Sequence, residues 1–354
     1  MKSLHFNTRI LIGIFCLGFL NFAYSQIQND TITTTESQKK CLLKIADKLK
    51  EHYIFQDIAH QMDSFIYQEI DSYTQLTPIY FAKKLTTSLQ EISKDKHLVL
   101  LHLEKELPLS NDLSKKEQAK IFRDINRRWN FGFEEVRRLD GNIGYINYTG
   151  FADPAASQLA LSSAMNFVAN TNTLIIDLRE NRGGNEDMMR LFCSYFIKER
   201  IHLSTTYTRH NNKTSRSYTQ KRVSGLKYID KAVYFLTSSQ TFSAGEALPY
   251  LLQSYGLAKV IGEQTGGAAN PVDGFIIDNT YLLLIPIAQS TIMKTKTNWE
   301  HKGVTPDITI YKEKALAQAH LLILQDLLQN KVSTELSQKE LEEKIKSLQQ
   351  TLNQ

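Results

Sequence analysis

Cysteine is scarce in this chain. Only three of the 354 residues are cysteine, and Cys16 lies in an apolar stretch near the N-terminus. The other two, Cys41 and Cys193, are too few for the disulfide framework of a small secreted domain. They either form one disulfide or remain as two buried thiols. No spacing of Cys, His or carboxylates is typical of a zinc site, and no glycine loop of the Walker type occurs. The sequence therefore predicts neither a metal nor a cofactor.

Long apolar runs are absent after residue 25. Lys2 and Arg9 form a basic start, residues 10–22 are apolar, and Ala23-Tyr24-Ser25 is a small-x-small site before Gln26. This pattern predicts a secretory signal peptide over residues 1–25. The apolar stretch is shorter than the roughly 20 residues that span a bilayer, and no small residue directly precedes Cys16 as a lipoprotein site would require. We expect a periplasmic or extracellular protein without a stable membrane anchor.

A strong excess of one charge is also absent. The formal net charge is +5 and falls to about +3 without Lys2 and Arg9. So mild an excess gives no argument for a nucleic-acid partner. The hydrophobic content of 42% is sufficient for one large domain or two modest ones.

The composition and the spacing of apolar residues divide the remaining sequence into five segments. Residues 26–36 are polar and predict a disordered linker, whereas helical spacing of apolar residues predicts a helical N-terminal subdomain over 37–103. Residues 104–140 form a charged connecting segment, residues 141–311 alternate strand and helix patterns, and residues 312–354 are helical. Alternating β and α elements predict an α/β fold with a mainly parallel sheet. Ser337 and Glu340 fit a helix capping box.

The expected elements have defined ranges. Strands are predicted over residues 98–103, 143–148, 173–178, 232–236, 259–262 and 281–287, the last two as additions to the sheet. Helices are predicted over residues 115–129, where Arg127 and Arg128 are expected to face solvent, and over 154–170, 186–196, 244–255, 312–329 and from 337 onward.

Ser243 is the most informative residue. It follows the apolar strand 232–236 and a polar turn, and it opens the helix 244–255. At such a place a hydroxyl can face a cleft, with backbone N–H groups and the helix dipole beside it. This geometry suits attack on a carbonyl and stabilisation of the oxyanion that results. An ordinary N-cap serine gives the same pattern, so this segment alone leaves both interpretations open.

Four further segments accompany Ser243. Two contain paired glycines that let backbone amides approach a ligand, a third supplies a histidine in the titration range of a general base, and a fourth supplies a carboxylate that can orient this histidine. The segments are Asp177-Leu178-Arg179-Glu180-Asn181-Arg182-Gly183-Gly184, Gly262-Glu263-Gln264-Thr265-Gly266-Gly267-Ala268, Asp95-Lys96-His97 and Trp299-Glu300-His301-Lys302-Gly303-Val304-Thr305-Pro306-Asp307-Ile308.

In this order and spacing the segments resemble peptidase family S41, which contains the C-terminal processing proteases, the tricorn core and the interphotoreceptor retinoid-binding proteins. The resemblance runs from about residue 97 to residue 308. It implies a crotonase-like ββα spiral core with a helical N-terminal subdomain, and it matches Ser243 to the nucleophile. It also matches the amides of Gly183 or Gly184, together with that of Ala244, to the oxyanion hole.

Three departures refine this resemblance. The lysine base of the processing proteases is replaced by Ala268, which excludes a Ser–Lys dyad at the expected site. The tricorn-like branch instead implies His97 as the base and Glu300 as its orienting carboxylate, with Lys96 in place of the usual glycine. Only 43 residues separate His97 from Gly141, too few for the inserted PDZ domain of the processing proteases.

The leading hypothesis is therefore an exported serine endopeptidase that hydrolyses proteins or peptides through Ser243, His97 and Glu300. The alternative is a non-hydrolytic carrier of a hydrophobic ligand or peptide on the same scaffold, because fold does not fix function. A crotonase-type acyl-CoA isomerase or hydratase is a third interpretation, which export disfavours. The sequence leaves the cleavage preference and the oligomeric state open.

Overall fold

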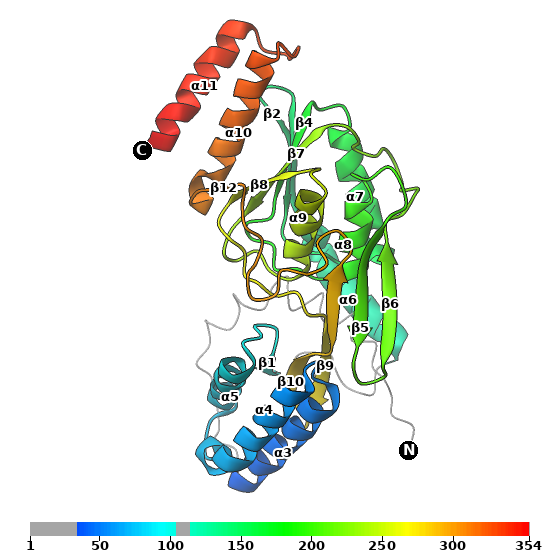
Figure 1. Cartoon of the computed structure of the whole chain (residues 1–354), viewed down its shortest axis with the longest axis vertical. Helices are drawn as coiled ribbons and strands as arrows, with labels where there is room; N and C mark the ends of the chain where they lie inside the picture. Colours follow the sequence, from blue (N-terminus) through cyan, green and yellow to red (C-terminus); the bar gives the residue numbers. More distant parts are fainter. Residues whose placement is uncertain (1–33, 104–113, 354) are drawn as a thin grey trace.

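The computed structural model describes residues 34–103 and 114–353. The predicted signal peptide and most of the predicted linker lie outside these residues. Along its long axis the molecule has three parts: a helical N-terminal subdomain, a central α/β core and a pair of C-terminal helices (Figure 1). Among the described residues, no helix is both long and apolar enough to cross a bilayer.

The N-terminal subdomain consists of amphipathic helices around an apolar core. The predicted helical spacing is confirmed, because Leu42, Ile45 and Leu49 are fully buried on one face. Cys41 is a free, buried thiol in this core, and Cys193 is a free, buried thiol in the central core, so the two do not form a disulfide. The elements are α3 (Thr35–His52), α4 (Gln56–Glu69), η1 (Ile70–Tyr73), α5 (Pro78–Ser93) and β1 (Val99–His102).

Two strands from the second half of the chain complete this subdomain. β9 (Val272–Ile277) and β10 (Tyr281–Pro286) form a hairpin, and β10 pairs antiparallel with β1. Leu283 and Ile285 of β10 are buried in the same apolar cluster as the helices. The prediction that residues 281–287 extend the main sheet is therefore wrong. The alternation of this short apolar run fits any half-buried sheet and does not identify its partner strand.

A six-stranded sheet forms the centre of the α/β core (Figure 1). Its strand order is β12-β8-β7-β4-β3-β2, with parallel pairing from β3 to β12 and antiparallel pairing of β2 with β3. The mainly parallel sheet is thus confirmed. The strands are β2 (Phe133–Leu139), β3 (Ile143–Tyr148), β4 (Thr173–Asp177), β7 (Ala232–Thr237), β8 (Lys259–Gly262) and β12 (Ile308–Thr309).

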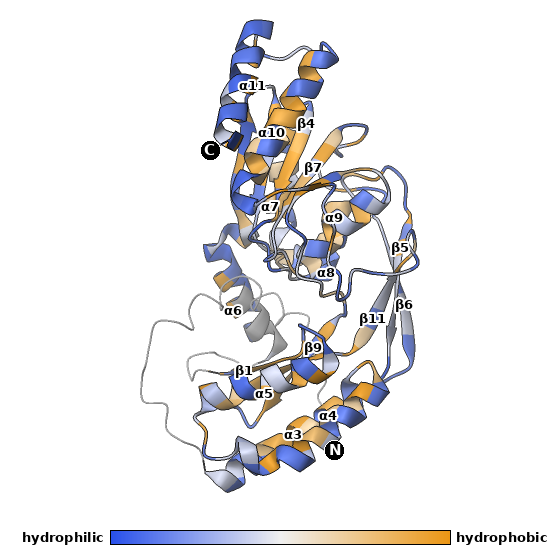
Figure 2. Cartoon of the chain, turned by 60° about the vertical axis from the view of Figure 1, so that its left-hand side comes forward, coloured by the Kyte–Doolittle hydropathy of each residue, from blue (hydrophilic) through white to orange (hydrophobic). Residues whose placement is uncertain are grey.

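Both faces of this sheet are buried, which explains why its strands are continuous apolar runs. Ile146, Ile176 and Phe235 point to one face and pack with helices α7 (Pro154–Val168), α8 (Glu186–Cys193) and α9 (Ala244–Ser254). Tyr145, Ile175 and Tyr234 point to the other face and pack against α10 (Lys312–Gln329). Figure 2 shows these strands as hydrophobic segments between more polar outer helices.

The remaining elements flank the core. A second antiparallel sheet has the order β11-β5-β6, built from β11 (Ala288–Ile292), β5 (His202–Thr208) and β6 (Lys213–Tyr218). The segment between the N-terminal subdomain and the core contains α6 (Lys115–Arg128), η2 (Asn130–Gly132) and the edge strand β2. Arg127 and Arg128 of α6 are exposed, as predicted.

The C-terminal helices follow the predicted pattern. α11 (Gln338–Asn353) packs against α10, with Leu341 buried between them. The N–H of Ser337 donates to Oε2 of Glu340 (2.8 Å), and the N–H of Glu340 donates to Oγ of Ser337 (3.3 Å). The predicted capping box is confirmed.

Candidate active site

Ser243 lies on a sharp turn between β7 and α9. Its backbone angles are φ +55° and ψ −121°, whereas an ordinary N-cap residue has an extended backbone with negative φ. A residue other than glycine in this region costs about 1–3 kcal/mol, and such strain is concentrated at functional sites. Ser243 is thus the N-cap of α9, as the sequence pattern allowed, but with a backbone conformation that an ordinary N-cap serine does not have.

A buried carboxylate holds this turn in place. Glu246, one helical turn after Ser243, is fully buried, and the N–H of Ser243 donates to its Oε2 (2.8 Å). Its other donors come from the glycine-rich loop after β8: Oγ1 of Thr265 (2.5 Å) and the N–H of Gly267 (2.6 Å) bind Oε1, and the N–H of Ala268 (3.0 Å) binds Oε2. Burial raises the pKa of Glu246, and these hydrogen bonds oppose the rise.

Sequence reasoning missed this role of Glu246. The available signal was the Ser-x-x-Glu spacing of a capping box, but that spacing does not reveal donors from a loop about 20 residues further along the chain.

The paired glycines lie directly against the serine turn. Gly183 has φ +96°, and a Cβ at this position would lie 2.8 Å from the Cβ of Ser243 and 3.0 Å from the backbone nitrogen of Ala244. Gly184 has φ +129°, and a Cβ there would lie 2.3 Å from the carbonyl oxygen of Phe151. Only glycine fits either position, because both the backbone angle and the space exclude a side chain.

The two glycine amides differ in their availability. The N–H of Gly183 donates to Oδ1 of Asn181 (2.8 Å). In the β-bridge between Phe151 and Gly184, the N–H of Phe151 donates to the carbonyl of Gly183, and the N–H of Asn185 donates to the carbonyl of Phe151. The N–H of Gly184 takes no part in this bridge. Of the two alternatives that the sequence left open, Gly183 thus has its N–H already engaged in a hydrogen bond within its own loop.

His97 follows α5 and packs beside the serine turn. Its ring lies edge-on to Phe242, with ring centroids 4.8 Å apart, and Phe242 directly precedes Ser243. Both ring nitrogens are buried and have no hydrogen-bond partner among the described residues. Burial lowers the pKa of His97 to about 4, against the opposing charge of Asp95. The imidazole is therefore neutral near pH 7, the form in which a general base accepts a proton.

The two carboxylate oxygens of Glu300 differ in their partners. Its Oε2 accepts hydrogen bonds from the N–H groups of Ala269 (2.5 Å) and Asn270 (2.9 Å). Its Oε1 is buried without a hydrogen-bond partner among the described residues and lies 3.8 Å from Nδ1 of His301. Burial, and then the negative charge of Asp95, raise the pKa of Glu300 to about 7.

Asp95 links the two predicted partners of Ser243. Its Oδ1 accepts the N–H of His97 (3.0 Å), and its Oδ2 accepts Nδ2 of Asn270 (3.1 Å). Asn270 in turn donates its N–H to Glu300. Asp95 thus binds the main chain of His97 directly and is joined to Glu300 through Asn270, but the structure contains no direct hydrogen bond between His97 and either Ser243 or Glu300. Sequence reasoning gave Asp95 no separate role and missed Asn270, which lies beyond the recognised loop motif.

Lys96 and Ala268, the two residues that differ from the family motifs, both have well-defined surroundings in the structure. Nζ of Lys96 donates to the carbonyl of Gly266 (2.6 Å), so this lysine joins the N-terminal subdomain to the glycine-rich loop. Ala268 is fully buried.

Comparison with known proteins places this geometry in context. Residues 142–310 match the model of peptidase family S41. This region includes β3 to β12, the serine turn and both glycine-rich segments.

Solved structures share the fold over most of the chain. Mature CPAF has a TM-score of 0.57 at 11% identity, over 85% of this chain and 99% of that chain. A lipoprotein from Streptococcus agalactiae has a TM-score of 0.53 at 16% identity, over 83% and 98%. The photosystem II D1 C-terminal processing protease has a TM-score of 0.50 at 12% identity, over 78% and 94%. These likenesses confirm the α/β fold class, with a parallel-rich sheet and helices at both ends.

Proposed function

We propose that this chain, whose residues 142–310 match the model of peptidase family S41, is an exported serine endopeptidase that uses Ser243, His97 and Glu300. The observation that carries the proposal is the strained turn of Ser243, whose neighbour Phe242 contacts a buried imidazole with no hydrogen-bond partner on either nitrogen among the described residues. A serine hydroxyl is a weak nucleophile unless a base lies beside it. A neutral, unpaired imidazole at this place supplies the base.

The proposed reaction is acyl transfer. Oγ of Ser243 attacks the scissile carbonyl carbon while a ring nitrogen of His97 accepts the hydroxyl proton. The N–H groups of Gly184 and Ala244 stabilise the oxyanion, the C–N bond breaks, and His97 returns its proton to the leaving amine. Water then attacks the acyl-enzyme by the same route, which releases the carboxylic acid and regenerates the serine.

In this mechanism Glu300 is the group that stabilises the imidazolium. Its Oε1 is the acceptor for a ring N–H of His97, and closure of this hydrogen bond when substrate binds completes the catalytic set. Apo active sites often have long or open catalytic contacts that tighten only with substrate. Ionised Glu300 would then raise the pKa of His97 from its depressed value toward the range in which a base is effective.

Replacement of the nucleophile tests the proposal. The mature protein from Gln26 is expected to cleave unfolded casein and to react with a fluorophosphonate probe, and Ser243→Ala should abolish both, with cleavage reduced by several orders of magnitude. Ser239→Ala is the matched control, because Ser239 is exposed and four residues away on the same turn. Lys294, Lys296 and Lys302 should each be dispensable, since the mechanism uses no lysine.

Two outcomes would contradict the proposal. Full activity of Ser243→Ala would exclude the serine mechanism. A folded parent protein that neither cleaves casein nor reacts with the probe would favour the non-hydrolytic carrier instead. Export is tested separately by mass spectrometry of the cell-envelope and medium fractions, where the protein should begin at Gln26.

A further inference from the structure

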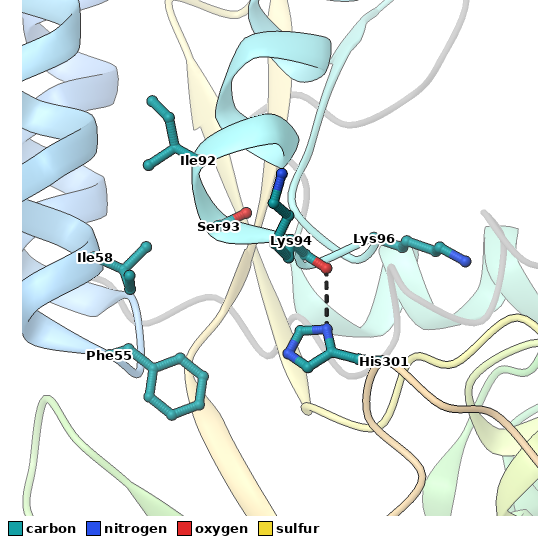
Figure 3. Close-up of a pocket in the computed structure, with 7 residues that line it drawn as sticks. All are labelled: Phe55, Ile58, Ile92, Ser93, Lys94, Lys96 and His301. Atoms are coloured by element: carbon teal, nitrogen blue, oxygen red, sulfur yellow. Dashed lines mark hydrogen bonds between the residues drawn. The ribbon is translucent and has the colours of Figure 1, made fainter.

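A pocket of about 560 Å³ lies between the N-terminal subdomain and the core (Figure 3). Most of its wall comes from the start of α4, the end of α5 and the turn after α5, and one residue comes from the core. The lining residues are Phe55, Ile58, Ile92, Ser93, Lys94, Lys96 and His301.

This pocket adjoins the proposed catalytic groups. Lys94 and Lys96 flank Asp95, Lys96 directly precedes His97, and His301 directly follows Glu300. Nδ1 of His301 lies 3.1 Å from the carbonyl oxygen of Lys94, and Figure 3 shows this contact across the pocket. The two turns that carry His97 and Glu300 therefore also form part of the pocket wall.

The lining combines an apolar surface with positive charge. Phe55, Ile58 and Ile92 supply the apolar part, and the ring of Phe55 remains 36% exposed. Lys94 and Lys96 supply positive charge, and His301 supplies an imidazole whose Nδ1 lies 3.8 Å from Oε1 of Glu300. Nζ of Lys96 is already bound to Gly266, whereas the contacts described for Lys94 use only its main chain. Lys94 is therefore the cation available to a ligand.

We propose that this pocket is a substrate subsite for an apolar side chain that is followed closely by a carboxylate. The inference rests on the proposed peptidase function and adds its substrate class. An apolar side chain removes the exposed faces of Phe55, Ile58 and Ile92 from water, and a carboxylate pairs with Nζ of Lys94. The carboxylate comes either from an Asp or Glu side chain or from the C-terminus of the substrate.

Binding to the Ser243→Ala protein tests the subsite without hydrolysis. Isothermal titration uses four twelve-residue peptides on one Gly-Ser background: a central Leu-Asp pair, Leu-Asn, Ser-Asp, and a single Leu at a free C-terminus. We expect binding of the Leu-Asp peptide to weaken about tenfold or more when Leu is replaced by Ser, and several-fold when Asp is replaced by Asn. Tighter binding of the C-terminal Leu peptide than of Leu-Asp would identify the chain end as the carboxylate, and the reverse order would identify the acidic side chain.

Charge reversal in the pocket provides the matched comparison. In the same Ser243→Ala background, Lys94→Glu should remove the preference for Asp over Asn, and Phe55→Ser should weaken the preference for Leu over Ser. Lys83→Glu is the control, because Lys83 is an exposed lysine earlier on α5 and outside the pocket lining. Equal affinity for all four peptides, absence of binding, or identical behaviour of Lys94→Glu and Lys83→Glu would overturn the subsite. Cleavage of casein by the parent protein decides the proposed function independently.

Discussion

The carboxylate of Glu246 lies beneath the turn that carries Ser243 and accepts hydrogen bonds from both the turn and the glycine-rich loop. It therefore connects the serine turn to the glycine-rich loop after β8, two segments that lie apart in the sequence. A carboxylate buried without donors would be costly, and four donors compensate for the loss of water. Glu246 touches no reacting atom, so we regard it as a positioning residue.

Replacement of Glu246 by Gln is expected to damage both stability and activity. The new amide NH₂ would face backbone N–H groups, which leaves buried donors unpaired and costs about 2 kcal/mol or more. A shift of the serine turn should lower kcat/KM about a hundredfold. Thermal unfolding and casein cleavage measure the two effects. Glu340→Gln is the control, because Glu340 caps Ser337 with the same spacing on an exposed helix; an equal effect of both changes would contradict the positioning role.

The pKa of Glu300 predicts a pH-dependent difference in stability. Glu300 holds its proton up to about pH 7 in the folded chain but loses it near pH 4.5 when unfolded. The folded state thus binds more protons across this window, and its stability falls as pH rises. Gln cannot lose a proton, so Glu300→Gln should gain stability relative to the parent by up to about 3 kcal/mol between pH 4.5 and 7. His97, whose folded pKa of about 4 acts in the opposite direction, is common to both proteins and cancels.

Chemical denaturation of both proteins at pH 5, 6, 7 and 8 measures this difference. A difference that stays constant with pH would show that Glu300 ionises normally in the folded chain. Glu263→Gln serves as control, since hydrogen bonds lower the pKa of Glu263 below 4.5 and the stability difference for this change should therefore stay nearly constant from pH 5 to pH 8.

At the scale of elements, one arginine binds the C-terminal end of α3 to the core. Arg209, which follows β5, donates its Nε to the carbonyl of Tyr53 (2.6 Å) and one Nη to the carbonyl of Lys50 (2.6 Å). These carbonyls lie at the C-terminal end of α3, where the helix dipole favours a cation. Arg209 therefore fixes the end of the first helix to the flanking sheet.

We expect Arg209→Ala to lower the free energy of unfolding by about 1–2 kcal/mol, because the carbonyls lose a charged donor. Arg209→Lys should restore part of this loss, since a lysine provides charge without the planar fork. Arg216→Ala, on the exposed strand β6, is the control and should have little effect. Urea unfolding measures all three, and an equal loss for Arg209→Ala and Arg216→Ala would contradict the capping role.

At the scale of the whole molecule, the N-terminal subdomain and the core are not independent units. The β9–β10 hairpin belongs to the second half of the chain but supplies Leu283 and Ile285 to the N-terminal apolar cluster. Hydrogen bonds from Arg209, Lys96 and Asn270 also cross between the two parts. The proposed base and nucleophile lie on opposite sides of this contact.

This contribution of the hairpin predicts that the two parts unfold together. Calorimetry of the mature protein should show a single transition covering the N-terminal subdomain and the core, because the N-terminal apolar cluster needs strands that belong to the same chain segment as the core. Two well-separated transitions would contradict the coupling. Leu283→Ala, which should cost about 2–5 kcal/mol by opening a cavity, is expected to shift the whole transition rather than one part of it.

The sequence by itself determined the elements whose periodicity and ends are local. The strands 143–148 and 232–236 are continuous apolar runs bounded by turn residues, and the capping box of Ser337 needs only its neighbours. The order of the glycine, serine and histidine motifs likewise identified the candidate site, because backbone approach at Gly183 and Gly184 leaves no alternative residue type.

Only the tertiary structure decided how distant segments combine. Strands β5, β6 and β9 are mostly half-buried or polar, so their patterns are weak, and the partner of β10 depends on long-range pairing. The same holds for Glu246, Asp95 and Asn270, whose roles come from donors and acceptors far away in the chain. Local periodicity records whether a side chain is buried, but hydrogen-bond partners and charge neighbours are properties of the packed molecule.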